Sequence, residues 1–203
     1  MSELGLFPLP LVLFPEEQVP LHVFEERYQE LIGECLEDDR EFGLVYADDD
    51  GIREVGTRAG VVSVLERFDD GRMNVVVEGR ERFRLLGLTS GRSFQTGDVA
   101  EVLDDDDPPD ADAVARALEL FERLRAATRS DVDVPSAETE RLSFVLAGRV
   151  ELAPDVKLEL LAELSERVRL DRVCELLELA SEAVERQRRA AERAATNGRV
   201  DLG

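Results

Sequence analysis

Four prolines interrupt the apolar run with which the chain opens, and this pattern limits the folds available to it. Proline has no N–H to donate to a β ladder, so it is confined to strand edges, strand starts and bends. Large apolar residues divided in this way predict short extended segments separated by bends rather than one long central strand. The prolines are Pro8, Pro10, Pro15 and Pro20.

Helical spacing replaces the proline pattern immediately after Pro20. Large apolar residues there recur three or four positions apart, which predicts one amphipathic helix that begins directly after the proline. They are Leu21, Phe24, Tyr28, Leu31, Ile32, Cys35 and Leu36.

Short β patterns fill the rest of the first half of the chain. Asp69-Asp70-Gly71 is a turn signal between two of these patterns, and Gly79 inside a strand pattern indicates a bulge or a barrel corner. Several short strands at this spacing predict a small barrel or a strongly bent sheet. The predicted strands cover residues 42–46, 60–68, 73–77, 82–86 and 94–103.

An acidic, proline-containing segment, DDDDPPDAD, runs from Asp104 to Asp112 and marks a change of pattern. Successive aspartates repel one another, and Pro108-Pro109 fits neither a helix interior nor a ladder. This composition indicates a solvated linker, and its spacing is not that of an EF-hand loop.

Helical periodicity dominates after the linker. Apolar stripes predict a helix around Val114–Leu124 and a second helix that starts at Ser136, with Leu142, Val145 and Leu146 in its stripe. A third helix is opened by Pro154, and a long last helix has its buried face from Leu170 to Val184. The end beyond Val184 has little apolar surface and is expected to project or fray, with Asn197-Gly198 as the stop.

The formal charge of −21 limits the choice of partners. Phosphate backbones and anionic membranes repel such a chain, so neither nucleic acid nor a membrane is an expected partner. No apolar run approaches the ~20 residues that span a bilayer, and the apolar start lacks the basic region and cleavage site of a signal peptide. The cytoplasm is therefore the expected location.

Several segments, taken together and in order, resemble the N-terminal domain of the Lon protease family. They are LFPLPLVLFPEEQVPLHVFEERYQELI from Leu6, FGLVY from Phe42, VGTRAGV from Val55, DGRMNVVVEGRERFRLLG from Asp70, and the helical RLSFVLAGRVELAPDVKLELLAELSERVRLDRVCELLE from Arg141. The resemblance covers nearly the whole chain and suggests a stand-alone Lon N-domain-like protein.

The resemblance implies an α+β fold, with a PUA-like β pseudo-barrel that contains one inserted helix, followed by an α-helical bundle. We predict a β lobe over residues 1–104, an acidic linker over 105–112, a helical bundle over 113–195 and a tail over 196–203. In full Lon proteases this domain helps to engage protein substrates. The implied function is non-catalytic binding of unfolded protein or peptide segments, linked to proteolysis or quality control, with a protease or chaperone as a further partner.

Catalytic chemistry has little support in the sequence. Lys157, the only lysine, follows no phosphate-binding glycine loop, so neither a Lon-type ATPase nor a Ser-Lys peptidase is expected. His22 is the only histidine, and we expect it to bond backbone where the loop turns into helix. Cys35 and Cys174 lie far apart and are predicted to be buried thiols. We therefore predict no enzyme, no catalytic residue, no metal and no cofactor.

Peptide contact is best placed in the loop after Phe14 and at the start of the following helix. The candidate peptide-binding residues combine large apolar side chains with polar neighbours, although both phenylalanines also suit a core. They are Phe14, Pro15, Phe24, Glu25 and Arg27.

Two other functions stay open at this stage. One is a small-molecule binder or uncharacterised enzyme with a pocket between the lobes. The other is RNA binding by analogy with PUA domains, which the charge opposes. Arg80, Arg82 and Arg84 alternate on one strand and fit either an anion-binding ridge or salt bridges with nearby acids, and the net charge favours salt bridges.

Overall fold

The structure is a computed structural model and describes residues 2–197. The chain divides into two compact units, which are described separately. The first unit comprises the described residues of Met1–Asp105 together with Ala147–Leu164, and the second comprises those of Asp106–Leu146 and Ser165–Gly203.

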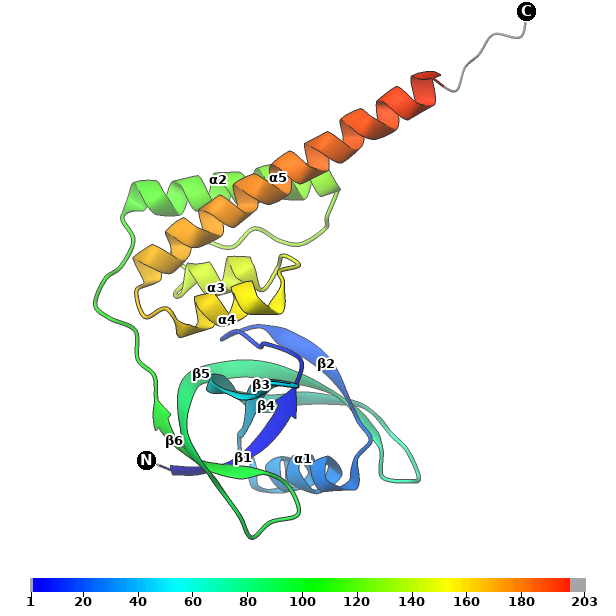
Figure 1. Cartoon of the computed structure of the whole chain (residues 1–203), viewed down its shortest axis with the longest axis vertical. Helices are drawn as coiled ribbons and strands as arrows, with labels where there is room; N and C mark the ends of the chain where they lie inside the picture. The colour runs from blue at the N-terminus through cyan, green and yellow to red at the C-terminus, as the bar shows by residue number, and fades with distance from the viewer. Residues whose placement is uncertain (1, 198–203) are drawn as a thin grey trace, which may run out of the picture. The chain divides into compact units, whose positions relative to one another are not determined.

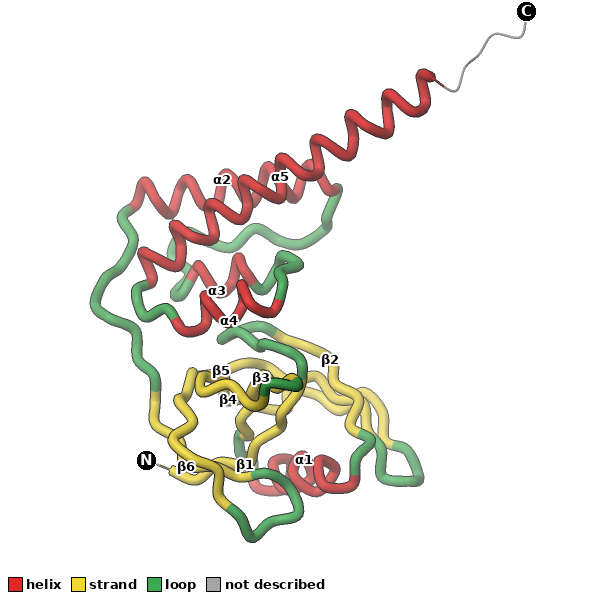
Figure 2. The backbone as a smooth tube through the Cα atoms, viewed as in Figure 1, coloured by secondary structure: helices red, strands yellow, loops and turns green. Residues whose placement is uncertain are grey.

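A six-stranded mixed sheet forms the first unit (Figures 1 and 2). The strands are β1 (Ser2–Leu9), β2 (Gln18–Val23), β3 (Phe42–Asp48), β4 (Gly51–Arg67), β5 (Met73–Thr89) and β6 (Thr96–Glu101). Their order is β2-β5-β4-β3-β1-β6, and an additional β5–β6 pairing closes five of them into a barrel. β1 and β3 are parallel, and the other pairs are antiparallel. The predicted α+β class is confirmed.

Gly79 divides β5 between two neighbours. β2 pairs with Met73–Glu78, and β6 pairs with Phe83–Thr89. The β4–β5 register shifts just after Gly79, so the predicted bulge is present, but the two predicted runs are one strand. The loop before β2 approaches Gly79 closely: Glu16 N–H donates to Gly79 O, and Gly79 N–H donates to Glu17 O.

The predicted helix start directly after Pro20 is wrong. Gln18–Val23 is strand β2, and the helix α1 begins at Glu26 and ends at Asp38. The physical reason is alternation: Leu21 and Val23 are buried, whereas Pro20 and His22 are exposed. A period of two therefore governs the residues that were assigned to the first helical turn.

One face of α1 packs into the larger apolar cluster of the first unit. Tyr28, Leu31, Ile32 and Cys35 are buried on this face, and Phe7 stacks on Tyr28 with ring centroids 4.1 Å apart. A second cluster consists of Leu4, Leu6, Val45, Phe83 and Val99.

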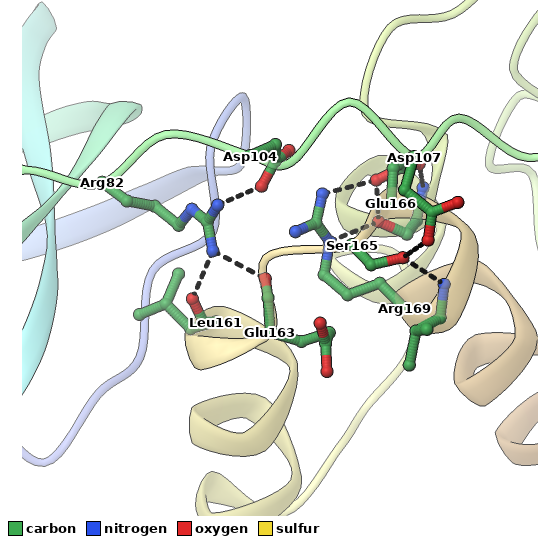
Figure 3. Close-up of polar contacts among 10 residues, drawn as sticks. Arg82, Asp104, Asp107, Leu161, Glu163, Ser165, Glu166 and Arg169 are labelled. Atoms are coloured by element: carbon green, nitrogen blue, oxygen red, sulfur yellow. Dashed lines mark hydrogen bonds and ion pairs between the residues drawn. The ribbon is translucent and has the colours of Figure 1, made fainter.

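Helix α4 (Pro154–Ala162) belongs to the first unit, although we predicted it in the helical bundle. Polar contacts explain its place. Lys157 Nζ lies 2.8 Å from Glu17 Oε1, and Arg82 donates to the carbonyl oxygens of Leu161 and Glu163 at 2.8 Å each (Figure 3). The predicted boundary of 113–195 therefore does not describe one compact unit.

The second unit contains α2 (Ala111–Thr128), most of α3 (Leu142–Ala147) and α5 (Glu166–Asn197). The predicted helix start at Ser136 is wrong, because α3 begins only at Leu142. α2 and α5 pack through buried residues that include Phe121 and Leu177. Arg169 of α5 is fully buried: its guanidinium lies 4.1 Å from the centroid of the Phe144 ring and donates to Glu166 and Ser143.

The acidic segment is more ordered than a solvated linker. Asp104 pairs with Arg82 within the first unit. In the second unit, Asp107 accepts a hydrogen bond from Ser165 (Figure 3). It also accepts hydrogen bonds from Arg167, and these contacts lower the pKa of its carboxyl. Asp110 caps α2. Three carboxylates of this segment, those of Asp104, Asp107 and Asp110, thus have specific structural partners.

No helix within residues 2–197 combines the length and apolarity needed to cross a membrane. The predicted tail lies mostly outside the described residues: α5 ends at Asn197, and Gly198, the predicted stop, is beyond them.

Candidate functional site

Two of the five predicted contact residues are buried. Phe14 has no exposed surface, and Pro15 is buried beside it. The Phe14 ring lies under Lys157, with Nζ 5.0 Å from its centroid. As the alternative interpretation held, this phenylalanine belongs to the core, so Phe14 and Pro15 are corrected to structural residues.

The other three predicted contact residues lie at the accessible surface between β2 and α1. Phe24 is 61% exposed, Arg27 is exposed and Glu25 is half-buried. Arg27 pairs with Glu25 at 2.7 Å and covers the Tyr28 ring at 4.5 Å. Burial raises the pKa of Tyr28. A peptide-binding role for Phe24, Glu25 and Arg27 stays a prediction.

A chain of three side chains lies next to Phe24 and orients the only histidine. Glu66 Oε2 accepts a hydrogen bond from Asn74 Nδ2 at 3.1 Å, and Asn74 Oδ1 lies 2.6 Å from His22 Nδ1. The expectation that His22 bonds backbone is wrong, because its partner is the Asn74 side chain.

Aromatic rings gather around this histidine. Its ring is stacked with Phe24 at 5.9 Å and meets the Phe68 ring edge-on at 6.2 Å. Arg72 covers Phe68 at 5.1 Å. β2, its loop to α1 and the turn between β4 and β5 thus meet at one end of the first unit (Figure 1). We call these residues the aromatic surface: His22, Phe24, Glu66, Phe68, Arg72 and Asn74.

The edge strand β2 borders the aromatic surface. β2 ends the sheet and pairs only with β5 among the described strands. Pro20 lies in the middle of β2 with its side chain exposed. Because proline has no N–H, this edge cannot offer a continuous row of donors to an added strand.

The alternating arginines form salt bridges, as we favoured. Arg80 pairs with Glu78 at 2.6 Å, Arg84 pairs with Glu54 at 3.1 Å, and the buried Arg82 pairs with Asp104. Their charges are therefore matched, which removes the support for an anion-binding ridge.

The first unit also has a small cavity of about 150 Å³ between β1, α1 and Phe94. Its volume is below the several hundred Å³ typical of ligand pockets. Two arginines line it: Arg92 pairs with Glu34, and Arg40 pairs with Asp38. A wider depression of about 430 Å³ also includes Cys35, and its two arginines, Arg40 and Arg80, are paired as described. Neither hollow presents an unmatched arginine to a ligand.

Both thiols are expected to react slowly in the folded protein. Burial raises the pKa of Cys35 to about 11 and raises that of Cys174. Relative to an ordinary thiol, the thiolate fraction of Cys35 at pH 8 falls by roughly 100-fold. Alkylation by iodoacetamide at pH 8, followed by mass spectrometry, should give little labelling when native and two labels after denaturation. Rapid native labelling of Cys35 would contradict this.

Metal chemistry has no site in the described part of the chain: no group of three or more His, Cys, Asp or Glu side chains there is arranged to hold an ion. His22 is oriented by an amide rather than by a nucleophile or a second base. The arrangement of the aromatic surface therefore suits recognition, through exposed rings and an oriented imidazole.

Most of the chain matches a known protein family. Residues 3–178 match the family model described as the ATP-dependent protease La (LON) substrate-binding domain. The chain belongs to this family.

Relatives include Lon protease 1 of Hydrogenovibrio crunogenus, 26% identical over 88% of this chain, and Lon protease of Brucella abortus, 27% identical over 93%. The chain spans about a quarter of their lengths, 24% and 26%. These matches concern the substrate-binding domain.

Solved structures agree with the fold. The Lon N-terminal domain protein from Xanthomonas campestris matches with a TM-score of 0.69 and 25% identity, over 85% of this chain and 97% of that one. The N-terminal domain of Mycobacterium avium complex Lon protease matches with a TM-score of 0.67 and 18% identity, over 87% and 98% of the two chains. The second likeness concerns the fold alone.

Proposed function

We propose that this chain binds unfolded or apolar protein segments and has no catalytic activity of its own. Membership of a substrate-binding family supports a binding function, and the exposed Phe24 within the aromatic surface is the observation that carries the proposal. Covering a phenylalanine side chain with an apolar partner is worth about 1.5–3 kcal/mol. Such a contact accepts many sequences, as a binder of unfolded chains requires.

The surroundings of Lys157 support the absence of peptidase activity. Its Nζ contacts the Glu17 carboxylate and, at 3.4 Å, the Val12 carbonyl oxygen. Neither partner is a hydroxyl, so this lysine has no serine to activate among those bonds. The only lysine of the chain is therefore engaged in a structural ion pair with Glu17.

Charge supports polypeptide over RNA. Phosphate contacts dominate nucleic-acid affinity, and a net charge of −21 opposes them. Contacts to exposed aromatic rings are not screened by salt, whereas ion pairs are. Binding to unfolded protein should therefore persist at high salt.

A fluorescence titration tests the proposal. The wild-type protein is expected to bind a reduced, carboxymethylated protein at both low and high salt, and to show no affinity for a single-stranded RNA. Replacing Phe24 by serine should weaken binding about tenfold, which corresponds to about 1.4 kcal/mol.

Leu88→Ser is the matched control for this titration. Leu88 is 54% exposed and lies in the half of β5 that pairs with β6, so its loss should leave affinity unchanged. Salt-sensitive RNA binding without a response to the unfolded protein would support the RNA alternative. Equal losses for both variants would argue against the aromatic surface as the site.

A further inference from the structure

We propose that His22 accepts, through Nε2, a hydrogen bond from a backbone N–H of a bound apolar polypeptide, while a neighbouring side chain of that polypeptide covers Phe24. The inference rests on the proposed function, because it identifies how the aromatic surface recognises its ligand. It makes His22 a specificity-determining residue.

The first step is the orientation of the Asn74 amide. A carboxylate only accepts hydrogen bonds, so the group that Asn74 directs at Glu66 must be its NH₂. The amide oxygen then faces His22 Nδ1 at 2.6 Å. Because this oxygen only accepts, Nδ1 must carry the proton that is donated.

The second step is the state of the other ring nitrogen. In a neutral imidazole with the proton on Nδ1, Nε2 is an acceptor. The His22 side chain is exposed, and among the described residues its one hydrogen-bond partner is Asn74. A ligand atom that meets Nε2 in this state must bring a donor; a carbonyl or carboxylate oxygen does not satisfy it.

The third step is the apolar frame around this acceptor. Phe24 stacks with the imidazole and Phe68 lies edge-on to it, so two aromatic rings flank the ring that carries Nε2. An apolar peptide offers both features in adjacent positions, since almost every residue supplies one N–H next to a side chain. A small alcohol would supply a donor for Nε2 but no adjacent apolar side chains to cover Phe24.

Pro20 favours recognition by side chains over the addition of a strand to β2. The side chains of Gln18, Pro20 and His22 are exposed along β2, and Pro20 has no N–H that an added strand could accept. A bound segment therefore gains its specific hydrogen bond from the imidazole rather than from a continuous ladder.

Asn74 and Glu66 are positioning residues in this scheme. They touch no ligand, but they hold the proton on Nδ1 and fix the ring. Asn74→Leu should weaken peptide binding about threefold and abolish the preference for an N–H at one ligand position, a readout that a purely structural role would not change.

The test uses a short, unstructured, fluorescein-labelled peptide rich in leucine and phenylalanine, and a set of copies that each carry one N-methylated amide. For the wild-type protein, methylation at one position should weaken binding 5- to 10-fold. For His22→Phe, which keeps an aromatic ring but no acceptor, the parent peptide should bind 5- to 10-fold more weakly and the methylation penalty should vanish.

His22→Gln, which keeps a side-chain acceptor, should recover part of the affinity and part of the penalty. Because the His22 side chain is exposed, His22→Phe and His22→Gln are expected to unfold at the same midpoint as the wild type, measured by far-UV circular dichroism. Equal methylation penalties in wild type and His22→Phe, or equal affinities, would overturn the inference while peptide binding itself stands. Absence of any peptide binding by the wild type would overturn the proposed function as well.

Discussion

Replacing Gly79 by alanine is expected to destabilise the first unit by about 3 kcal/mol or more. An added Cβ would lie 2.0 Å from the Phe14 carbonyl oxygen and 2.9 Å from its carbonyl carbon. These are backbone atoms, so no side-chain rotation relieves the clash. The loop must move away from β5 and lose the paired hydrogen bonds between Gly79 and residues Glu16 and Glu17.

Gly87→Ala is the matched control, since Gly87 lies in the same strand and an added Cβ would meet no atom within 4 Å. Its stability should stay within about 1 kcal/mol of wild type, or rise slightly because alanine restricts the unfolded chain. Urea unfolding followed by circular dichroism measures both variants. Equal unfolding midpoints would contradict the close approach of the loop.

The second large effect is expected for Arg82→Met. Arg82 is 3% exposed and donates to the Leu161 and Glu163 carbonyl oxygens, and it also pairs with Asp104. Removing one partner of a buried ion pair typically costs about 3–5 kcal/mol, since the other groups lose their counterpart. Helix α4 would lose the cation that holds its C-terminal end.

Arg84→Met provides the comparison two residues further along the strand. Its ion pair with Glu54 is exposed, with side-chain exposures of 48% and 75%, and such pairs contribute roughly 0–1 kcal/mol. Urea midpoints should therefore differ clearly between the two variants. A double variant, Arg82→Met with Asp104→Leu, should recover part of the loss because it removes the charge left behind.

Much of the fold could be predicted from local patterns. The turn at Asp69-Asp70-Gly71, the bulge near Gly79 and the start of α4 at Pro154 follow from backbone chemistry that these residue types carry wherever they occur. The division of residues 21–38 could not be read in the same way. Leu21 satisfies a period of two and a period near four equally well, and only pairing with β5 decides between them.

The membership of α4 was also hidden in the sequence. Arg82 and Lys157 show no sign of their distant partners, because the contacts join residues 79 and 140 positions apart. From its strand pattern alone, Arg82 is predicted to be exposed, and only its contacts with the end of α4 show that it is buried.

The candidate site was only partly predictable. Phe24 was placed correctly at an accessible surface, whereas Phe14 looked equivalent in sequence and is buried. His22 was assigned a structural role because it stands at a segment boundary, where its ring was expected to bond backbone as the loop turns into helix. Its partner, Asn74, follows 52 residues later and reaches it only through the pairing of β2 with β5. The alternation of Pro20, Leu21, His22 and Val23 was the one available signal that the histidine faces outward.

The ion pair of Lys157 has a practical consequence for chemical labelling. This amine is the only lysine in the chain, and its side chain is 13% exposed against Glu17. Apart from the amino terminus, the folded protein offers amine-directed cross-linkers almost nothing to attack. Amine-reactive reagents should therefore label lysines of a bound polypeptide and leave this protein almost unlabelled. Such labelling would distinguish the bound polypeptide from the protein that binds it.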